Sequence, residues 1–514
     1  MAEELSTNLG ATQKMNVAKT VIPDVSTAFR VFCLAVFFVI GLQTLYAVPF
    51  GIIAKISEFS APVRAIFSAI ICATTIVAGV FLIRFGVARY PTLGESARQI
   101  RSKVVWTVVV AGLAARILII VFATVAPASD AKAYMQLGQI LANNDPYFFS
   151  GRWAYWPVGY PFILSTWFRM FGPTVGSVQI LNLLLYLVAC SGILALAKAW
   201  QQENAGKLAV LAFACWLDLI VLTAWPSKEL VAIALIPWVL VLCACQPVSI
   251  SRKLIARAVA GSIAGLLVLV QPSFILLIPV IPLVSAQRNG HRYRSTLIDV
   301  AIVTFAAMLT VAPWTIRNYQ VFGEFIPVAT NGGEVFYRAN NPLATGGYIK
   351  RGEVDLWDLP ELAAHQEGAR LAKQWILANP GEFIGLVVRK QLLFLEDDSI
   401  GVYEVFSRGH IGAPISETTY LFSKLACVIY WYLLWAIFSS ALYILIKMRQ
   451  WQASGFLFLA MPLLYLYGIH SIFESGPRYH QPASAVLVLA IAATFLAATR
   501  ALSVRIRVEG QAQQ

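Results

Sequence analysis

Long apolar runs recur along this chain, each close to 20 residues in length. A helix of about that length spans the hydrocarbon core of a bilayer. Charged residues make up only 13% of the chain, against roughly 25% in soluble domains. We therefore predict an all-α polytopic membrane protein with about twelve transmembrane helices. The predicted spans are 30–52, 61–85, 104–125, 175–197, 207–224, 230–245, 254–270, 274–286, 297–312, 420–446, 455–473 and 483–501.

The basic residues predict the orientation of these spans. They cluster in short loops that all fall on one side of the membrane when the spans are counted as above. By the positive-inside rule this side is the cytoplasm, so both termini are expected inside. The net charge of +13 is therefore spread over several loops and forms no single basic patch. This distribution argues against a nucleic-acid partner. The clusters contain Arg89, Arg98, Arg101, Lys103, Arg252, Lys253, Arg288, Arg292, Arg294, Lys447, Arg449, Arg505 and Arg507.

Loops and spans divide the chain into successive parts. In order, they are a polar cytoplasmic tail (1–29), two spans with a basic loop (30–103), a transmembrane core (104–313) that includes a first outer loop (127–174), a second outer loop (314–419), the last spans (420–503) and a cytoplasmic tail (504–514). The polar residues suited to chemistry concentrate in the two outer loops.

The second outer loop is predicted to contain helices of its own. Residues 360–379 are expected to form one, because Pro360 stands at its start and Pro380 follows its end. Segment 386–395 is apolar but too short to span, so it is expected at the membrane surface. The acidic run 396–398 that follows is interpreted as a solvated edge.

Asp130, just beyond the third span, is the candidate general base. A carboxylate at the mouth of a helix bundle can have a tuned pKa, although a loop Asp that caps the next helix fits the same position. Aromatic residues crowd the rest of the first outer loop and include Tyr134, Trp156 and Tyr160. Such rings stack on sugars, but they also form the usual aromatic belt of membrane proteins.

Cations on the outer side are candidates for holding a phosphate, which an Arg fork binds with two hydrogen bonds and a Lys as a point charge. They could instead pair with nearby acids such as Glu229 or Glu474. Arg116 lies inside a span, where an ionisable group suggests a function. The candidates are Arg478, His480, Arg317, Lys132 and Lys228.

Familiar cofactor motifs are missing from the sequence. It contains no HExxH, GxGxxG or P-loop pattern. It therefore specifies no certain cofactor, and a divalent metal would have no clear ligand set.

Four segments in order resemble the GT-C superfamily of membrane glycosyltransferases. They are SDAKAYMQLGQIL with WPVGYPFILSTWFRMFG, then APWTIRNYQVFGEFIPVATNGGEVFYRANNPLATGGY, then ANPGEFIGLVVRKQLLFLE, and finally SGPRYHQPASAVLVLA. The likeness is to the bacterial group similar to dolichyl-phosphate-mannose–protein mannosyltransferases, aminoarabinose transferases and Rgt-type enzymes. It covers about residues 104–501, although Val158 and Gln271 stand where the family often has Pro and Arg.

This resemblance implies an inverting transfer of a sugar from a polyprenyl-phosphate donor to an acceptor hydroxyl. The acceptor would be a lipid, a glycan or a protein. The enzyme would lie in the bacterial inner membrane with its site on the periplasmic side, and Asp130 would be the base. The expected donor-phosphate ligands are Arg478, His480, Arg317 and Lys132, and the expected substrate contacts are Tyr134, Trp156, Tyr160, Lys228, Glu229, Asn340, Asn341 and Tyr479.

Two other functions fit a chain of this kind. An O-antigen ligase or polymerase has a similar number of spans, but its chemistry centres on a late outer loop. A lipid or polysaccharide transporter would carry ionisable groups at mid-membrane and internal repeats. Arg116 and Lys228 are the only hints of the first feature, and no repeat is obvious.

Overall fold

The computed structural model describes residues 25–56, 60–89, 100–247, 249–286, 293–450 and 457–511. Most of the predicted N-terminal tail, together with Arg98, Arg288 and Arg292 of the basic clusters, lies outside these residues. The helices are α2 (Val25–Ile56), α3 (Ala61–Arg89), α5 (Ser102–Phe122), α6 (Ser129–Ala142), α7 (Gly159–Phe171), α8 (Val175–Ala199), α9 (Glu203–Ala214), α10 (Leu217–Leu222), α11 (Glu229–Ala244), α12 (Ile250–Val270), η2 (Pro272–Phe274), α13 (Leu277–Ala286), α14 (Tyr293–Phe322), α15 (Gly332–Ala339), α16 (Glu361–Ala378), α17 (Pro380–Leu395), α18 (Ile400–Tyr403), η3 (Glu404–Arg408), α19 (Glu417–Lys447), α20 (Met461–Ile472), η5 (Pro477–Tyr479), η6 (Gln481–Ala483) and α21 (Ser484–Gln511).

Eight helical segments within the described residues are long and apolar enough to cross a membrane. They coincide with eight of the predicted spans, because long apolar helices satisfy their own backbone groups in lipid. The predicted all-α membrane fold is therefore confirmed. The other predicted spans, 207–224, 230–245, 274–286 and 455–473, contain shorter helices.

A break between α9 and α10 interrupts one of these predicted spans. The buried Arg116 of α5 crosses to this point and donates from Nη1 to the carbonyl of Ala214, at 3.1 Å. Its guanidinium lies 3.8 Å from the ring centroid of Tyr186. Since a freed carbonyl inside a membrane needs a partner, Arg116 caps the broken helix.

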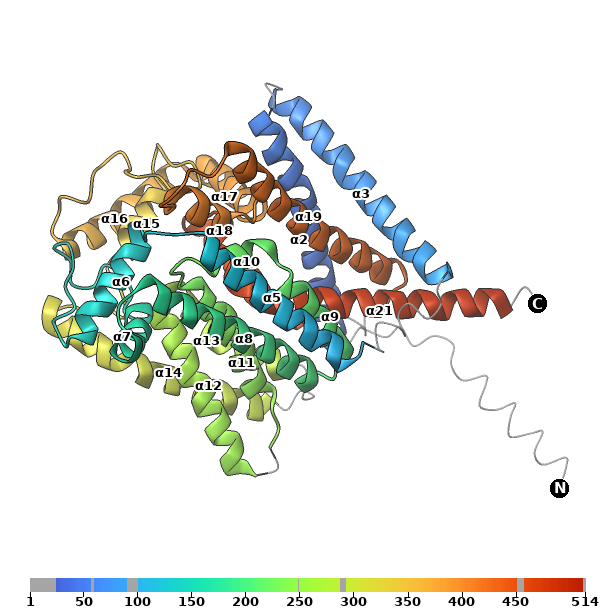
Figure 1. The fold of residues 1–514 in the computed structure, drawn as a ribbon, viewed down its shortest axis with the longest axis horizontal. Helices are drawn as coiled ribbons and strands as arrows, with labels where there is room; N and C mark the ends of the chain where they lie inside the picture. The colour runs from blue at the N-terminus through green and yellow to red at the C-terminus, as the bar shows by residue number, and fades with distance from the viewer. Residues whose placement is uncertain are drawn as a thin grey trace.

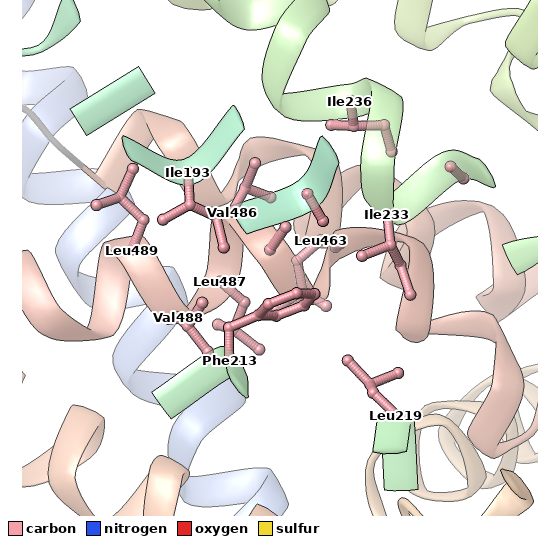
Figure 2. Close-up of a cluster of buried hydrophobic side chains, with 14 of the residues drawn as sticks. Ile193, Phe213, Leu219, Ile233, Ile236, Leu463, Val486, Leu487, Val488 and Leu489 are labelled. Atoms are coloured by element: carbon pink, nitrogen blue, oxygen red, sulfur yellow. The ribbon is translucent and has the colours of Figure 1, made fainter. Parts of the chain in front are cut away.

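Close helix packing holds the bundle together (Figure 1). Gly261 and Gly265 of α12 face α14 so closely that an added Cβ would lie 2.4 Å from the Val303 carbonyl oxygen and 2.7 Å from that of Ala307. This is the small-residue spacing that lets membrane helices approach. Side chains from α8, α9, α11, α20 and α21 fill the centre of the molecule, and Figure 2 shows Phe213 among them.

The two long loops meet at one end of the bundle (Figure 1), where the amides of Trp153 and Ala154 donate to Glu361 of α16. An isolated bridge pairs Val125 with His410, and the amide of Ala126 donates to the carbonyl of Gly409 at 2.8 Å. Helix α17 begins at Pro380 and is longer than the predicted surface segment 386–395. Helix α16 confirms the predicted loop helix.

Candidate functional site

A pocket opens where the helices α6, α11 and α18 begin and where the turn η5 leads into α21. It encloses about 490 Å³ of empty space, including its open mouth. Its walls carry three carboxylates and three cations, so the lining is close to neutral overall. The charged residues are Asp130, Glu229, Glu404, Lys228, Arg408 and Arg478.

Asp130 occupies the first turn of α6, where a negative charge is favoured by the helix dipole. Its side chain is 50% exposed, and Trp156 Nε1 donates to its Oδ1 at 3.2 Å. The preceding residue, Ser129, has a φ of 50°, a left-handed conformation that costs energy for any residue but glycine. The chain thus turns sharply to aim this carboxylate into the pocket.

Arg478 reaches the pocket from η5, which lies far from Asp130 in the sequence. Its Nη1 lies 3.9 Å from Asp130 Oδ2, and its Nη2 donates to the hydroxyl of Tyr479 at 3.0 Å. The guanidinium carbon stands 4.9 Å from the Tyr479 ring centroid. A cation and a carboxylate from distant segments therefore meet in one pocket.

Lys228 adds a second positive charge at the start of α11. Burial lowers the pKa of Lys228, and the neighbouring Glu229 opposes that effect. Its Nζ lies 5.7 Å from the ring centroid of Tyr134, and Tyr134 in turn meets Tyr160 edge to face at 5.6 Å. Burial, reinforced by Asp130, raises the pKa of Tyr134 well above its usual value, so this phenol stays neutral.

Three of the predicted phosphate ligands lie outside the pocket lining. His480 is buried, with Nδ1 beside the carbonyl of Phe394 at 2.8 Å and Nε2 beside Asp398 Oδ1 at 3.0 Å. Arg317 donates to the backbone carbonyls of Trp153 and Tyr147, each at 2.9 Å.

The third, Lys132, is exposed on α6. The structure thus groups Arg478 and Lys228 with Asp130 and gives His480 and Arg317 other partners.

Asn340 and Asn341 also have partners away from the pocket. Asn340 is buried and accepts from Lys390 Nζ at 2.9 Å. Asn341 bonds to the carbonyl of Tyr337 and accepts from the amide of Leu343. These contacts shape the turn after α15 rather than the pocket wall.

Sequence reasoning missed two charged lining residues, Glu404 and Arg408. They form an ion pair of 2.9 Å along the π-helix η3, a geometry that is frequent at functional sites. Burial raises the pKa of Glu404, and Arg408 works against that rise. The only signal in the sequence was an acidic and a basic residue four positions apart. An ordinary ion pair on the surface of a short loop helix has the same spacing.

The acidic run 396–398 does not form the solvated edge expected from the sequence. Asp398 is fully buried and accepts from Trp216 Nε1 at 2.5 Å, so the solvated edge was wrong. Beside it, the buried Asp218 accepts from Gln481 Nε2 at 2.7 Å and from the amide of Gly401 at 2.7 Å. This network lies next to the pocket and holds η6 against α18.

A second charged network joins the pocket to α15. Arg338 donates to Glu334 at 2.7 Å and to Glu474 at 3.4 Å. Burial disfavours its charge, but Glu474, Tyr155 and Glu334 together raise the pKa of Arg338 above its usual value. Within the described part of the chain, no group of three His, Cys, Asp or Glu side chains could hold a metal ion.

No protein-family model and no curated protein matches the sequence. Among solved structures, the chain is similar to an Archaeoglobus fulgidus oligosaccharyltransferase in complex with Zn and sulfate, with a TM-score of 0.42, 13% identity, and coverage of 77% of this chain and 53% of that one. It is also similar to the Archaeoglobus fulgidus oligosaccharyltransferase AglB in complex with an inhibitory peptide and a dolichol-phosphate, with a TM-score of 0.43, 10% identity, and coverage of 77% and 50%. The chain therefore spans about half the length of these proteins.

Proposed function

We propose that this chain is a GT-C-type membrane glycosyltransferase that moves a sugar from a polyprenyl-phosphate donor to an acceptor hydroxyl. The observation that carries the proposal is the meeting of Asp130, Arg478 and Lys228 in one pocket. A carboxylate able to accept a proton thus lies beside two cations able to hold a phosphate. The ordered resemblance of four sequence segments to that superfamily points to the same chemistry.

The reaction is a single displacement at the anomeric carbon of the sugar. Asp130 takes the proton of the acceptor hydroxyl while that oxygen attacks the carbon. The bond from the carbon to the phosphate oxygen breaks, and the lipid phosphate leaves with the electron pair. Arg478 and Lys228 offset the negative charge that grows on the leaving oxygen. One displacement inverts the configuration of the sugar.

The neighbouring side chains supply the rest of the site. Trp156 donates to Asp130 and so orients the carboxylate, while Tyr134 lines the same pocket and packs edge to face on Tyr160. A donor with a polyprenyl tail enters sideways from the bilayer, because the pocket lies at the start of the apolar helix α11 and at the turn that leads into the long apolar helix α21. The pocket side of the protein would then face the periplasm of a bacterial inner membrane, with a lipid, glycan or protein acceptor.

The test is a transfer assay with the full chain in phospholipid nanodiscs. Polyprenyl-phosphate sugars with different labelled sugars are each incubated with a crude envelope fraction as the source of acceptor. We expect the label of one donor to move onto the acceptor fraction and the lipid phosphate to be released. The full chain in vesicles that contain the same labelled lipids is assayed in parallel, to test whether it moves the lipid across the membrane.

Two results would overturn the proposal. No transfer from any donor, together with movement of labelled lipid across the vesicle membrane, would favour a transporter. Transfer of a preassembled glycan that persists in Asp130→Asn would favour a ligase centred on the second loop.

A further inference from the structure

Glu474 lies in the turn between α20 and η5 and is only 2% exposed. Its Oε1 accepts the hydroxyl of Tyr479 at 2.7 Å, and its Oε2 accepts from Arg338 Nη2 at 3.4 Å. Arg478 Nη2 lies 3.9 Å from the same Oε1. Because a buried carboxylate is costly without partners, these contacts explain how its charge is held.

Tyr479 transmits this arrangement to Arg478. The Tyr479 hydroxyl donates its hydrogen to Glu474. The hydroxyl oxygen therefore accepts the hydrogen bond from Arg478 Nη2, at 3.0 Å. The Tyr479 ring is stacked on His470 with centroids 4.1 Å apart. The ring cannot swing without breaking both contacts, and the direction of each hydrogen bond is fixed.

One nitrogen of Arg478 is thereby anchored and the other is left for the pocket. Nη2 is held by Tyr479, while Nη1 points to Asp130 at 3.9 Å, longer than a hydrogen bond. A guanidinium is a rigid planar fork, so fixing one nitrogen sets the direction of the other. The anchor is Glu474, through the Tyr479 hydroxyl.

Arg338 extends the network to α15 in the second loop. It lies between Glu334 and Glu474, and Tyr155 donates to Glu334 at 3.2 Å. The two carboxylates and the two arginines, Arg338 and Arg478, balance in charge. Glu474 is occupied by these partners, which leaves Asp130 as the half-exposed acid beside Arg478.

We infer that Glu474 is a positioning residue, which aims the Arg478 fork at the donor phosphate by way of Tyr479 and ties that fork to α15. The inference rests on the proposed role of Arg478 in binding the donor. It concerns affinity for the lipid phosphate and leaves the proton transfer to Asp130.

Binding of undecaprenyl phosphate to the full chain in nanodiscs tests this inference, because the probe needs neither the sugar nor the acceptor. Glu474→Gln keeps the shape but removes the charge and puts an amide near Arg338 or Tyr479. We expect its Kd to rise about tenfold, as for a lost charge-assisted hydrogen bond. Tyr479→Phe should weaken binding in the same direction, since it removes the hydroxyl that links the two residues.

Glu361→Gln is the matched control. Glu361 is also buried, at 9% exposure, and holds the amide of Ala154 at 2.9 Å and the hydroxyl of Thr330 at 2.5 Å. It does not line the pocket. Its change should leave the Kd within about twofold of the wild type.

A double-mutant cycle separates positioning from general damage. In an Arg478→Ala background, Glu474→Gln should add less than about twofold to the Kd, since residues that act through one another are not additive. A full additional tenfold loss would overturn the inference. If Glu474→Gln does not fold, the same cycle with Tyr479→Phe decides the question.

The same measurements distinguish a failure of the proposed function from a failure of this inference. If the wild type binds undecaprenyl phosphate no better than Arg478→Ala does, the donor site itself is wrong. If Arg478→Ala weakens binding but Glu474→Gln and Tyr479→Phe bind as the wild type does, only the positioning role is wrong. In the transfer assay, Glu474→Gln should raise the donor KM and also lower kcat, because Arg478 holds the bound phosphate and offsets the charge on the leaving oxygen.

Discussion

The carboxylate of Asp130 lies 3.9 Å from the guanidinium of Arg478, and the two side chains stay 50% and 35% exposed. A tight buried pair would neutralise both groups and commit each to the other. This longer, open contact is weak, so Asp130 keeps a free oxygen and Arg478 keeps a free nitrogen. The pair suits a site in which each partner also meets a substrate.

Replacing Asp130 with Asn should abolish most turnover while leaving the fold and donor binding intact. Asn keeps the shape and can still accept from Trp156, but it cannot take a proton. We expect kcat to fall at least about 100-fold, measured by single-turnover transfer. Asp145→Asn is the control, since Asp145 is exposed in a turn of the same loop. Near-normal turnover by well-folded Asp130→Asn protein would remove Asp130 from the chemistry.

The end of the molecule that carries the two loops should face the outside of the cell. The one-sided clustering of Lys and Arg motivates this expectation. In a variant without the seven native cysteines, an impermeant maleimide should label Lys350→Cys in the second loop and spare Arg252→Cys at the start of α12. Both positions are exposed. The reverse pattern would invert the topology and place the pocket in the cytoplasm.

Arg116→Leu should destabilise the bundle by about 1–3 kcal/mol, because it leaves the carbonyl of Ala214 without this donor inside the membrane. The apparent melting temperature in detergent reports the loss. Arg84→Leu is the control, because Arg84 lies on an exposed face of α3. Equal melting temperatures for wild type and Arg116→Leu would contradict the capping role.

Lys390 should make stability depend on pH in the alkaline range. Burial lowers the pKa of Lys390 to about 8, against about 10.4 for an unfolded lysine. Between these values the unfolded chain binds more protons than the folded one, so stability rises with pH. Thermal unfolding from pH 7.5 to 10.5 should show the stability of the wild type rising relative to that of Lys390→Met, since the other titrating groups are common to both. Parallel curves for the two proteins would refute the assignment.

The sequence was sufficient for the eight long spans, and the structure places the predicted residues Asp130 and Arg478 3.9 Å apart. Apolar length alone decides where a helix can cross a membrane. The break after α9 escaped prediction, since Cys215 and Trp216 carry no helix-breaking signal and the partner, Arg116, lies far away in sequence. Tertiary contact, rather than local preference, stabilises that interruption.

The positions and partners of the remaining site residues could not be predicted from a single sequence. His480 is two residues from Arg478, yet it faces Asp398 instead of the pocket. Arg317 meets backbone carbonyls that no charge pattern marks. For a cation near a membrane surface, helix packing decides which acceptor is nearest, so sequence position alone could not show that His480 and Arg317 have partners outside the pocket.

The length of α19 has a consequence for handling the protein. Its 31 residues extend about 46 Å at 1.5 Å per residue, whereas the hydrocarbon core of a bilayer is about 30 Å thick. Such a helix must tilt steeply or project into the headgroups. Acyl-chain length therefore becomes an experimental variable, and short-chain detergents or thin bilayers would leave apolar turns of this helix in water.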